Sequence, residues 1–378
     1  MDGDIRPLVV LSFVQGLGPV LTRRLLRAFG SAEEILRSSE SRLRGVEGVG
    51  PQRAAAIRGS VEAAFAKADA ELALAAKSGV VLLGLTDPRY PKLLAPLDDA
   101  PTILYVRGVL DDALDRYPVA VVGSRDCSAY GIEQAERFGA ALGQSGLTVV
   151  SGGARGIDSA AHRGAVRLGG RTIAVLGCGL THAYPKENAE LFDRIVAAGG
   201  AVVSELPMRT PPAAENFPAR NRIIAGLSLG VLVIEAAAKS GSLITAQLAA
   251  EDYGREVFAL PGRVDSPHSR GTLDLLKQGG AMLVTEPADV IHALEGAAHH
   301  AHQGTHAERF PPVERTLPAG VNADPVGESV MAALREPLTA DELIDRTEAP
   351  PAAVRGQLTL LEIMGRVVRE GSRFRLAR

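Results

Sequence analysis

The sequence is poor in cysteine and has no surplus of basic residues. Cys127 and Cys178 are its only cysteines, so at most one bridge could form, which excludes a disulfide-framework domain and fits a reducing cytoplasm. The 41 Lys and Arg residues are outnumbered by 44 Asp and Glu, for a net charge of −3. No global attraction to nucleic acid follows. Any DNA site has to be a local concentration of basic groups and backbone N–H donors.

Long apolar runs are also absent. The most apolar stretches, such as residues 231–236, are shorter than the roughly 20 residues that a membrane-spanning helix needs. Residues 1–6 carry acids where a signal peptide would carry a basic segment. We therefore expect a soluble, cytoplasmic protein with no membrane partner.

The length of 378 residues exceeds what one hydrophobic core usually organises, and the composition is that of a globular protein. We predict four segments: a helical domain over 1–80, an α/β domain over 81–295, a linker over 296–325 and a winged-helix domain over 326–378.

The first segment contains two similar turns, Gly16-Leu17-Gly18-Pro19 and Gly48-Val49-Gly50-Pro51. Each precedes a helical pattern with basic residues near its start. Such turns resemble the helix-hairpin-helix motif, in which turn N–H groups face a DNA phosphate. The alternative is a pair of ordinary hairpins whose glycines only permit tight turns.

From about residue 119, short apolar runs alternate with helical patterns. This rhythm predicts a doubly wound, Rossmann-like and mainly parallel sheet, in which ligands lie beyond the carboxyl ends of the strands. The expected strands are Val119–Val122, Leu147–Val150, Thr172–Leu176, Ala201–Ser204, Val231–Ile234, Glu256–Leu260 and Met282–Thr285.

Two glycine-rich loops follow the first two of these strands. They contain Gly123, Ser124 and Arg125, and then Gly152, Gly153, Ala154 and Arg155. Small residues let a backbone approach a ligand closely, and the N–H groups of a following helix point outward. Two such loops at neighbouring strand ends predict a phosphate site.

Further polar groups follow the later strands. Lys186 could neutralise a phosphate and Asn188 could fix a sugar or base, or Asn188 caps a helix beside a solvated Lys186. Phe217 beside Arg220, Asn221 and Arg222 suits a stacked single strand, or Phe217 is core. A turn with small residues follows: Lys239, Ser240, Gly241, Ser242 and Thr245. Together these groups favour an extended polyanion, with a nucleotide as the alternative.

The last two segments carry weaker signals. His299, His300, His302 and His306 lie in the proline-containing linker without an ordered scaffold, so we expect no metal there. The winged-helix segment ends in a basic stretch with Arg366, Arg369, Arg373 and Arg375, for which we expect secondary contacts to DNA phosphates, duplex included.

Several strings in the central segment agree at once with one family. Gly123–Arg125, Ser151–Asp158 with His162, Tyr184–Asn188, Phe217–Gly226, Ser240–Ala246 and Gly254–Gly262 resemble, in order, the signatures of the DprA/Smf family of DNA-processing proteins. The resemblance implies a Rossmann-like domain that binds single-stranded DNA, forms a homodimer and helps load the RecA recombinase in natural transformation. It also implies that Arg125 and Lys186 are the main cationic contacts. No catalytic residue, metal or cofactor is expected.

Self-association fits apolar residues near the last predicted helix and strand, among them Leu273, Leu275, Leu276 and Met282, of which Leu273 and Leu276 are the interface candidates.

Two other functions stay open. A nucleotide phosphoribohydrolase would use acids at strand ends, for which Asp158, Glu205 and Glu235 are available, although no acid and base have a convincing spacing. Asp158 and His162 share a helix face, which capping and packing also explain. The second is a regulator whose central domain senses a nucleotide while its winged helix reads duplex DNA.

Overall fold

The computed structural model describes residues 4–302 and most of 325–376. Not described are 1–3, 303–324, 335, 348, 352, 355, 356, 359, 360, 362–365, 371, 372, 377 and 378. The chain divides into two compact units, Met1–Arg309 and Phe310–Arg378. Within the described residues, no helix is both long and apolar enough to cross a bilayer.

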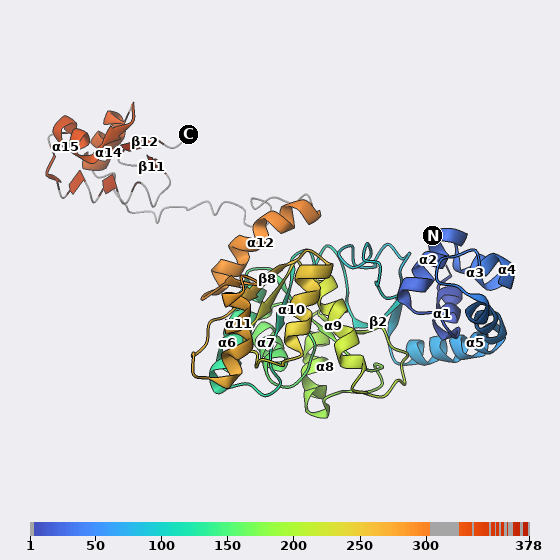
Figure 1. Ribbon diagram of the computed structural model, residues 1–378. Coiled ribbons are helices and arrows are strands. Elements are labelled where there is room, and N and C mark those ends of the chain that lie inside the picture. Colours follow the sequence, from blue (N-terminus) through green and yellow to red (C-terminus); the bar gives the residue numbers. More distant parts are fainter. Residues whose placement is uncertain are drawn as a thin grey trace. The chain divides into compact units, whose positions relative to one another are not determined.

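Five helices make up the first part of the larger unit (Figure 1). They are α1 (Arg6–Phe13), α2 (Pro19–Phe29), α3 (Ala32–Arg37), α4 (Glu40–Leu43) and α5 (Pro51–Lys77). Their apolar faces share one core with strand residues Leu82, Ile103 and Tyr105. Buried Glu71 of α5 accepts the backbone N–H of Met208 at 2.6 Å. The helical part is therefore packed directly against the sheet.

A nine-stranded sheet follows, in the order β1-β2-β6-β5-β4-β3-β7-β8-β9. The strands are β1 (Val81–Gly84), β2 (Ile103–Gly108), β3 (Pro118–Val122), β4 (Thr148–Ser151), β5 (Thr172–Val175), β6 (Ala201–Ser204), β7 (Gly230–Val233), β8 (Glu256–Ala259) and β9 (Met282–Leu283). From β6 to β9 all neighbours are parallel, whereas β2 pairs antiparallel with β6 and with β1. The prediction of a mainly parallel sheet is confirmed. The antiparallel pair β1–β2 was not predicted.

Helices cover both faces of this sheet (Figure 1). Alternate strand residues point to opposite faces, as Val119 and Val121 do against Ala120 and Val122. One face packs on α6 (Ala129–Gln144), α7 (Ile157–Arg167), α8 (Ala189–Ala197) and α12 (Pro287–His302). The other packs on α9 (Asn216–Gly226), α10 (Ser242–Gln247) and the π-helical turn η2 (Leu248–Asp252). Short η1 (Lys186–Asn188), η3 (Pro267–Ser269) and α11 (Arg270–Lys277) complete the unit.

The order of the strands places a switch point between β3 and β7. From β3 the chain adds β4, β5 and β6 on one side, and then returns to add β7, β8 and β9 on the other. The loops after β3 and β7 therefore separate, and a crevice opens between them.

The smaller unit contains α14 (Pro325–Ala333), α15 (Ala340–Thr347) and a sheet of β10 (Leu338–Thr339), β12 (Arg373–Leu376) and β11 (Val367–Glu370). Helices followed by a hairpin confirm the winged-helix prediction. The backbone of α12 continues to His302, so the first residues of the predicted linker are helical. The side chains of His299, His300 and His302, and all of His306, lie outside the described residues.

Candidate functional site

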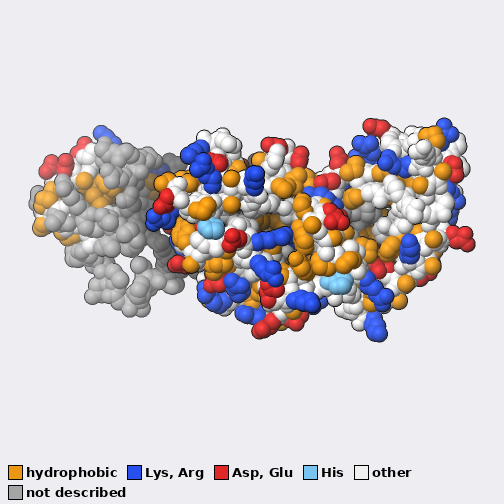
Figure 2. All heavy atoms as spheres, turned by 60° about the horizontal axis from the view of Figure 1, so that its bottom comes forward, with side chains coloured by type: hydrophobic (Ala, Val, Ile, Leu, Met, Phe, Trp, Pro, Cys, Tyr) orange, Lys and Arg blue, Asp and Glu red, His pale blue; other side chains and the backbone are white. Residues whose placement is uncertain are grey.

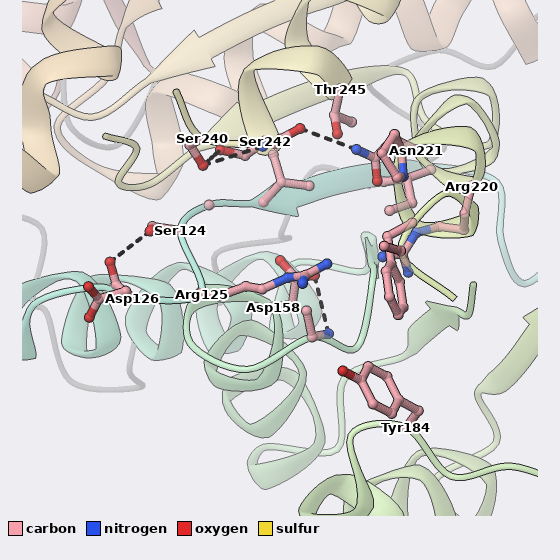
Figure 3. Close-up of a pocket in the computed structure, with 18 of the residues that line it drawn as sticks. Ser124, Arg125, Asp126, Asp158, Tyr184, Arg220, Asn221, Ser240, Ser242 and Thr245 are labelled. Atoms are coloured by element: carbon pink, nitrogen blue, oxygen red, sulfur yellow. Dashed lines mark hydrogen bonds between the residues drawn. The ribbon is translucent and has the colours of Figure 1, made fainter. Parts of the chain in front are cut away.

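A cavity of about 690 Å³ lies at the switch point (Figure 3). The loops after β3, β4 and β7 and the start of α9 form its walls. Residues predicted from the sequence that line it are Gly123, Ser124, Arg125, Ala154, Phe217, Arg220, Asn221, Ser240, Gly241, Ser242 and Thr245. The structure thus brings together groups from three loops and one helix that are far apart in the chain.

Arg125 is the central cation of this cavity. Its side chain extends between the Ser240–Ser242 turn and Tyr184 in Figure 3. Its guanidinium carbon lies 4.9 Å from the centroid of the Phe217 ring, a cation–π geometry. No ion pair joins Arg125 to a carboxylate in the part of the chain that the structure describes. Arg125 is therefore held by an aromatic ring and makes no direct ion pair within the described residues, although its charge attracts the buried Asp158 carboxyl on the same cavity wall.

Glu235 fixes the loop that carries Arg125. This buried carboxylate accepts the backbone N–H of Ser128 at 2.7 Å and the Ser128 hydroxyl at 2.8 Å. The backbone carbonyl of Glu235 accepts the N–H of Ser124 at 2.7 Å. Glu235, just after β7, thus bonds both ends of the 124–128 loop. Its role is therefore structural.

Arg220 supports the wall of the cavity through hydrogen bonds to the backbone. It is buried, and its Nη1 donates to the carbonyl oxygens of Gly152 and Val175. A Cβ at Gly152 would lie 2.6 Å from Asp158 Oδ2 and from Arg220 Nη2, so this glycine is required by internal packing. Burial lowers the pKa of Arg220 to about 10 and raises the pKa of neighbouring Asp158, against the attraction between the two. The pair supports the glycine loop, although both residues reach the cavity wall.

His162 lies under the same loop and packs as expected. Its ring is fully buried, and Nδ1 lies 2.7 Å from the Thr172 hydroxyl. Since that hydroxyl donates to the carbonyl of Val149, Nδ1–H is the donor toward Thr172. Burial lowers the pKa of His162 to about 3, so the ring is neutral. Asp158 accepts the N–H of Ala154 at 3.3 Å.

Small polar groups line the opposite wall. The hydroxyls of Ser240 and Ser242 lie 2.8 Å apart, and Asn221 Nδ2 donates to the carbonyl of Gly241 at 3.2 Å. A Cβ at Gly241 would meet nothing within 4 Å. The Ser240–Ser242 turn is therefore open to a ligand, unlike the tightly packed loop at Gly152.

Some predicted site residues do not line this cavity. Gly152 and Arg155 line a smaller adjoining cavity, while buried Asn188 donates to the Gly153 carbonyl at 2.9 Å and to Ser159 Oγ at 2.8 Å. Asn188 thus links η1 to the glycine loop after β4 and to the start of α7. Its side chain does not cap α8. Three basic residues remain: Arg222 is paired with Glu205, and Lys186 and Lys239 are exposed.

Tyr184 is the lining residue that sequence reasoning passed over. Its ring stacks on Phe217 with centroids 5.4 Å apart and an interplanar angle of 26°. It lies within a motif quoted for the family resemblance, but its partner is 33 residues away in the chain, so only the fold shows the contact. Asp126, Pro212 and Ala214 also line the cavity and were not predicted.

Comparison with known proteins agrees with this architecture. Residues 81–295 match the family described as DNA recombination-mediator protein A. The chain is 43% identical over 276 residues to Protein Smf of Escherichia coli, covering 73% of this chain and 72% of that one. It is 36% identical to Protein Smf of Synechocystis, covering 95% of each chain. The chain belongs to the DprA/Smf family.

Solved structures of the family have the same fold. The DprA structure from Streptococcus pneumoniae superposes with a TM-score of 0.66 at 37% identity, covering 77% of this chain and 98% of that one. A structure that addresses the single-stranded DNA binding mode of DprA from Helicobacter pylori has a TM-score of 0.50 at 32% identity, covering 57% and 95%.

The accessory domains match as well. Residues 314–372 match the DprA winged helix domain and residues 9–63 a SAM-like helix-hairpin-helix tandem. In the winged helix, Arg366 and Arg373 are exposed, Arg373 Nη1 donates to the Pro337 carbonyl at 3.2 Å, and Arg375 is partly buried. The side chain of Arg369 is outside the described residues. Segment 326–378 carries equal numbers of acidic and basic residues, so it is not basic as a whole.

The surface is mixed in charge. On the face drawn in Figure 2, Lys and Arg side chains lie among acidic and hydrophobic ones. Within the residues that the structure describes, no three His, Cys, Asp or Glu side chains are grouped to hold a metal ion.

Proposed function

We propose that this chain binds single-stranded DNA in the switch-point cavity. The observation that carries the proposal is Arg125, which contacts the Phe217 ring beside an open serine turn and makes no direct ion pair with a carboxylate among the described residues. Phosphates would meet Arg125 and the Ser240–Ser242 turn, with Lys186, Lys239, Gly123, Ser124 and Ala154 along the rim. Arg220, Arg222 and Asn188 would hold the loops. The structure of the relative from Helicobacter pylori, which addresses its single-stranded DNA binding mode, supports this ligand.

The test is a competition measured by fluorescence anisotropy. Labelled oligo(dT) bound to the full chain is challenged with unlabelled single strand, duplex of equal length or nucleoside monophosphates. We expect the single strand to displace the label at the lowest concentration. Displacement by a mononucleotide at equal concentration would instead favour a nucleotide-sensing role.

The three acids that a hydrolase could use are all engaged in internal contacts. Glu205 is paired with Arg222 and Glu235 holds Ser128, while Asp158 is buried beside Arg220. We propose that the chain acts as a binding protein and not as an enzyme. Release of free base from nucleoside monophosphates by the purified chain would contradict this.

We further propose that the bound strand is passed to the RecA recombinase during natural transformation, as family membership supports. The purified chain should accelerate RecA assembly on single strands already coated with a single-strand-binding protein. Normal DNA binding without any acceleration would separate the two proposals.

Self-association is proposed through the β9 edge of the sheet. Met282 and Leu283 are 48% and 53% exposed there, and Leu273 and Leu276 of α11 are half-buried nearby in sequence. Met282→Lys should shift a dimer to monomer in sedimentation velocity. Leu168→Lys is the matched control, since Leu168 is equally exposed at the end of α7. Wild-type monomer at micromolar concentration would refute the proposal.

For the winged helix we propose supplementary phosphate contacts, to duplex more than to single strands. Removal of residues 326–378, which lie within the separate compact unit, should weaken duplex binding at low salt. Unchanged affinity for both forms would make this unit a module for protein contacts.

A further inference from the structure

Two aromatic side chains line the cavity, Phe217 and Tyr184, and their contacts differ. The Phe217 ring contacts both the Arg125 guanidinium and the Tyr184 ring, which lie 4.9 and 5.4 Å from its centroid. A Cβ at Gly177 would lie 2.9 Å from Phe217 Cδ1, so its edge is also packed. Phe217 is thus engaged by three neighbours.

Tyr184 has the more accessible ring. Its side chain belongs to a residue that is 37% exposed, whereas Phe217 is only partly exposed. Tyr184 lines both the large cavity and the smaller one that adjoins it. A nucleobase needs an uncovered aromatic face to stack on. The exposed part of Tyr184, on the wall of both cavities, is where we place that face.

The loop of Tyr184 is anchored at its far end. Asn188 Nδ2 bonds Gly153 and Ser159, and Glu187 pairs with Arg155 of the glycine loop, which lowers the pKa of the Glu187 carboxyl. The ring is therefore fixed relative to the loop that supplies backbone N–H groups. Exposed Lys186 follows two residues later and would neutralise the phosphate of a nucleotide stacked on Tyr184.

We infer that Tyr184 is the residue on which a base of the single strand stacks, and that Phe217 acts indirectly by holding Arg125 and Tyr184 in place. This inference rests on the proposed function and assigns stacking to Tyr184 in place of Phe217, for which the sequence had left stacking and core packing open. The ligand class is a strand with an unpaired, accessible base, because a base within a duplex has both faces covered by its neighbours.

The experiment uses the full chain and oligo(dT) carrying one 5-iododeoxyuridine, which crosslinks under ultraviolet light to an aromatic side chain stacked on it. The crosslinked peptide identified by mass spectrometry should contain Tyr184. Tyr184→Phe should keep the crosslink and the affinity. Tyr184→Leu should weaken binding about tenfold with an unchanged salt dependence, since one stacked base is lost and no charge is removed.

Phe217→Leu should behave differently. It should lower both the affinity and the steepness of log affinity against log salt, because Arg125 loses its seat. A crosslink at Phe217, with normal binding by Tyr184→Leu, would overturn the inference and leave DNA binding intact. Failure of the wild-type chain to bind oligo(dT) at all would instead reject the proposed function. Thermal melts of each variant separate loss of contact from loss of fold.

Discussion

The helical part and the switch-point cavity both contain glycine turns that open helices, yet they differ in what their arginines do. In the helical part, Gly18 precedes α2 and Gly50 precedes α5, each followed by proline at the helix start. The arginines beside these turns are engaged: Arg53 donates to the Gly48 carbonyl at 2.5 Å, and Arg24 lies 3.6 Å from Glu47.

The two turns also face each other's helices. A Cβ at Gly16 would lie 3.4 Å from Arg53 Cγ, and one at Gly48 would lie 3.6 Å from Arg24 Nη1. At the cavity, by contrast, Gly241 faces open space and Arg125 contacts an aromatic ring without a direct ion pair in the described part of the chain. We therefore expect a phosphate to bind at the cavity turn and not at the two turns of the helical part.

The strongest test of this contrast reverses one charge in each region. Arg125→Glu should weaken single-strand binding at least about a hundredfold, because a charge-assisted contact worth about 1.5–3 kcal/mol is replaced by repulsion. Arg24→Glu should change affinity less than about threefold, since that arginine only reaches an exposed partner. Anisotropy titrations with thermal melts measure both. Equal losses from the two variants would mean that the helical part also holds DNA.

A second prediction concerns how the stability of the sheet domain, which contains buried His162, depends on pH. Burial lowers the pKa of His162 to about 3 in the folded chain, against about 6.5 in an unfolded chain, so between these two pH values the unfolded chain binds a proton that the folded chain does not. This stabilisation is present above pH 6.5 and is lost as the pH falls toward the folded value. The free energy of unfolding should fall by about 1.4 kcal/mol per pH unit between pH 6 and 4.

Denaturant titrations over this range of pH check the slope. His162→Gln should flatten it, while neutral-pH stability changes separately through packing. An identical slope in this variant would assign the acid sensitivity to other groups.

A smaller effect is expected for single lysines. Lys186→Ala should reduce the slope of log affinity against log salt by about 0.7, the value for one neutralised charge on a single strand. Lys67→Ala, an exposed lysine on α5, should leave the slope unchanged. If Lys67 lowers the slope as much as Lys186 does, DNA extends over the helical part.

The smallest expected effects come from two glycine substitutions, one of which should lower stability and the other DNA affinity. Gly48→Ala should cost about 1 kcal/mol of stability without weakening DNA binding, because its φ of +89° strains any other residue. Gly241→Ala should melt like wild type, since its Cβ enters open space, but weaken binding a few-fold by hindering phosphate approach. Calorimetry and anisotropy together check this pair, and a melting loss at Gly241 would contradict the described turn.

Sequence patterns predicted the parts of this chain whose physics is local. The seven parallel strands are short apolar runs followed by turns, nearly all of them buried except for the edge strand β9, and all seven were found. The β1–β2 pair was missed because a long proline-containing stretch separates the two strands in the sequence. Their antiparallel pairing is visible only in the folded chain.

Side-chain roles were harder to predict where partners come from distant elements. Arg220 reads as a DNA contact in a basic string, yet it is buried because α9 places it against the carbonyls of Gly152 and Val175. Tyr184 was passed over because its stacking on Phe217 joins a loop to the start of α9, 33 residues further along the chain. Burial and stacking of this kind depend on tertiary packing, which periodicity does not encode.

The position of the cavity at the switch point has a consequence for folding. Its walls come from the loop after β3 and from residues 240–245 beyond β7, and β7 pairs with β3 only after β4, β5 and β6 have been made. Such a site is closed by contacts between residues more than a hundred positions apart, which are slow to form. A growing chain that ends before residue 230 would hold Arg125 but not the opposing serine turn, nor the Glu235 carboxylate that fixes the Arg125 loop. We therefore expect affinity for the proposed ligand to appear only after β7 and the turn that follows it have joined the sheet.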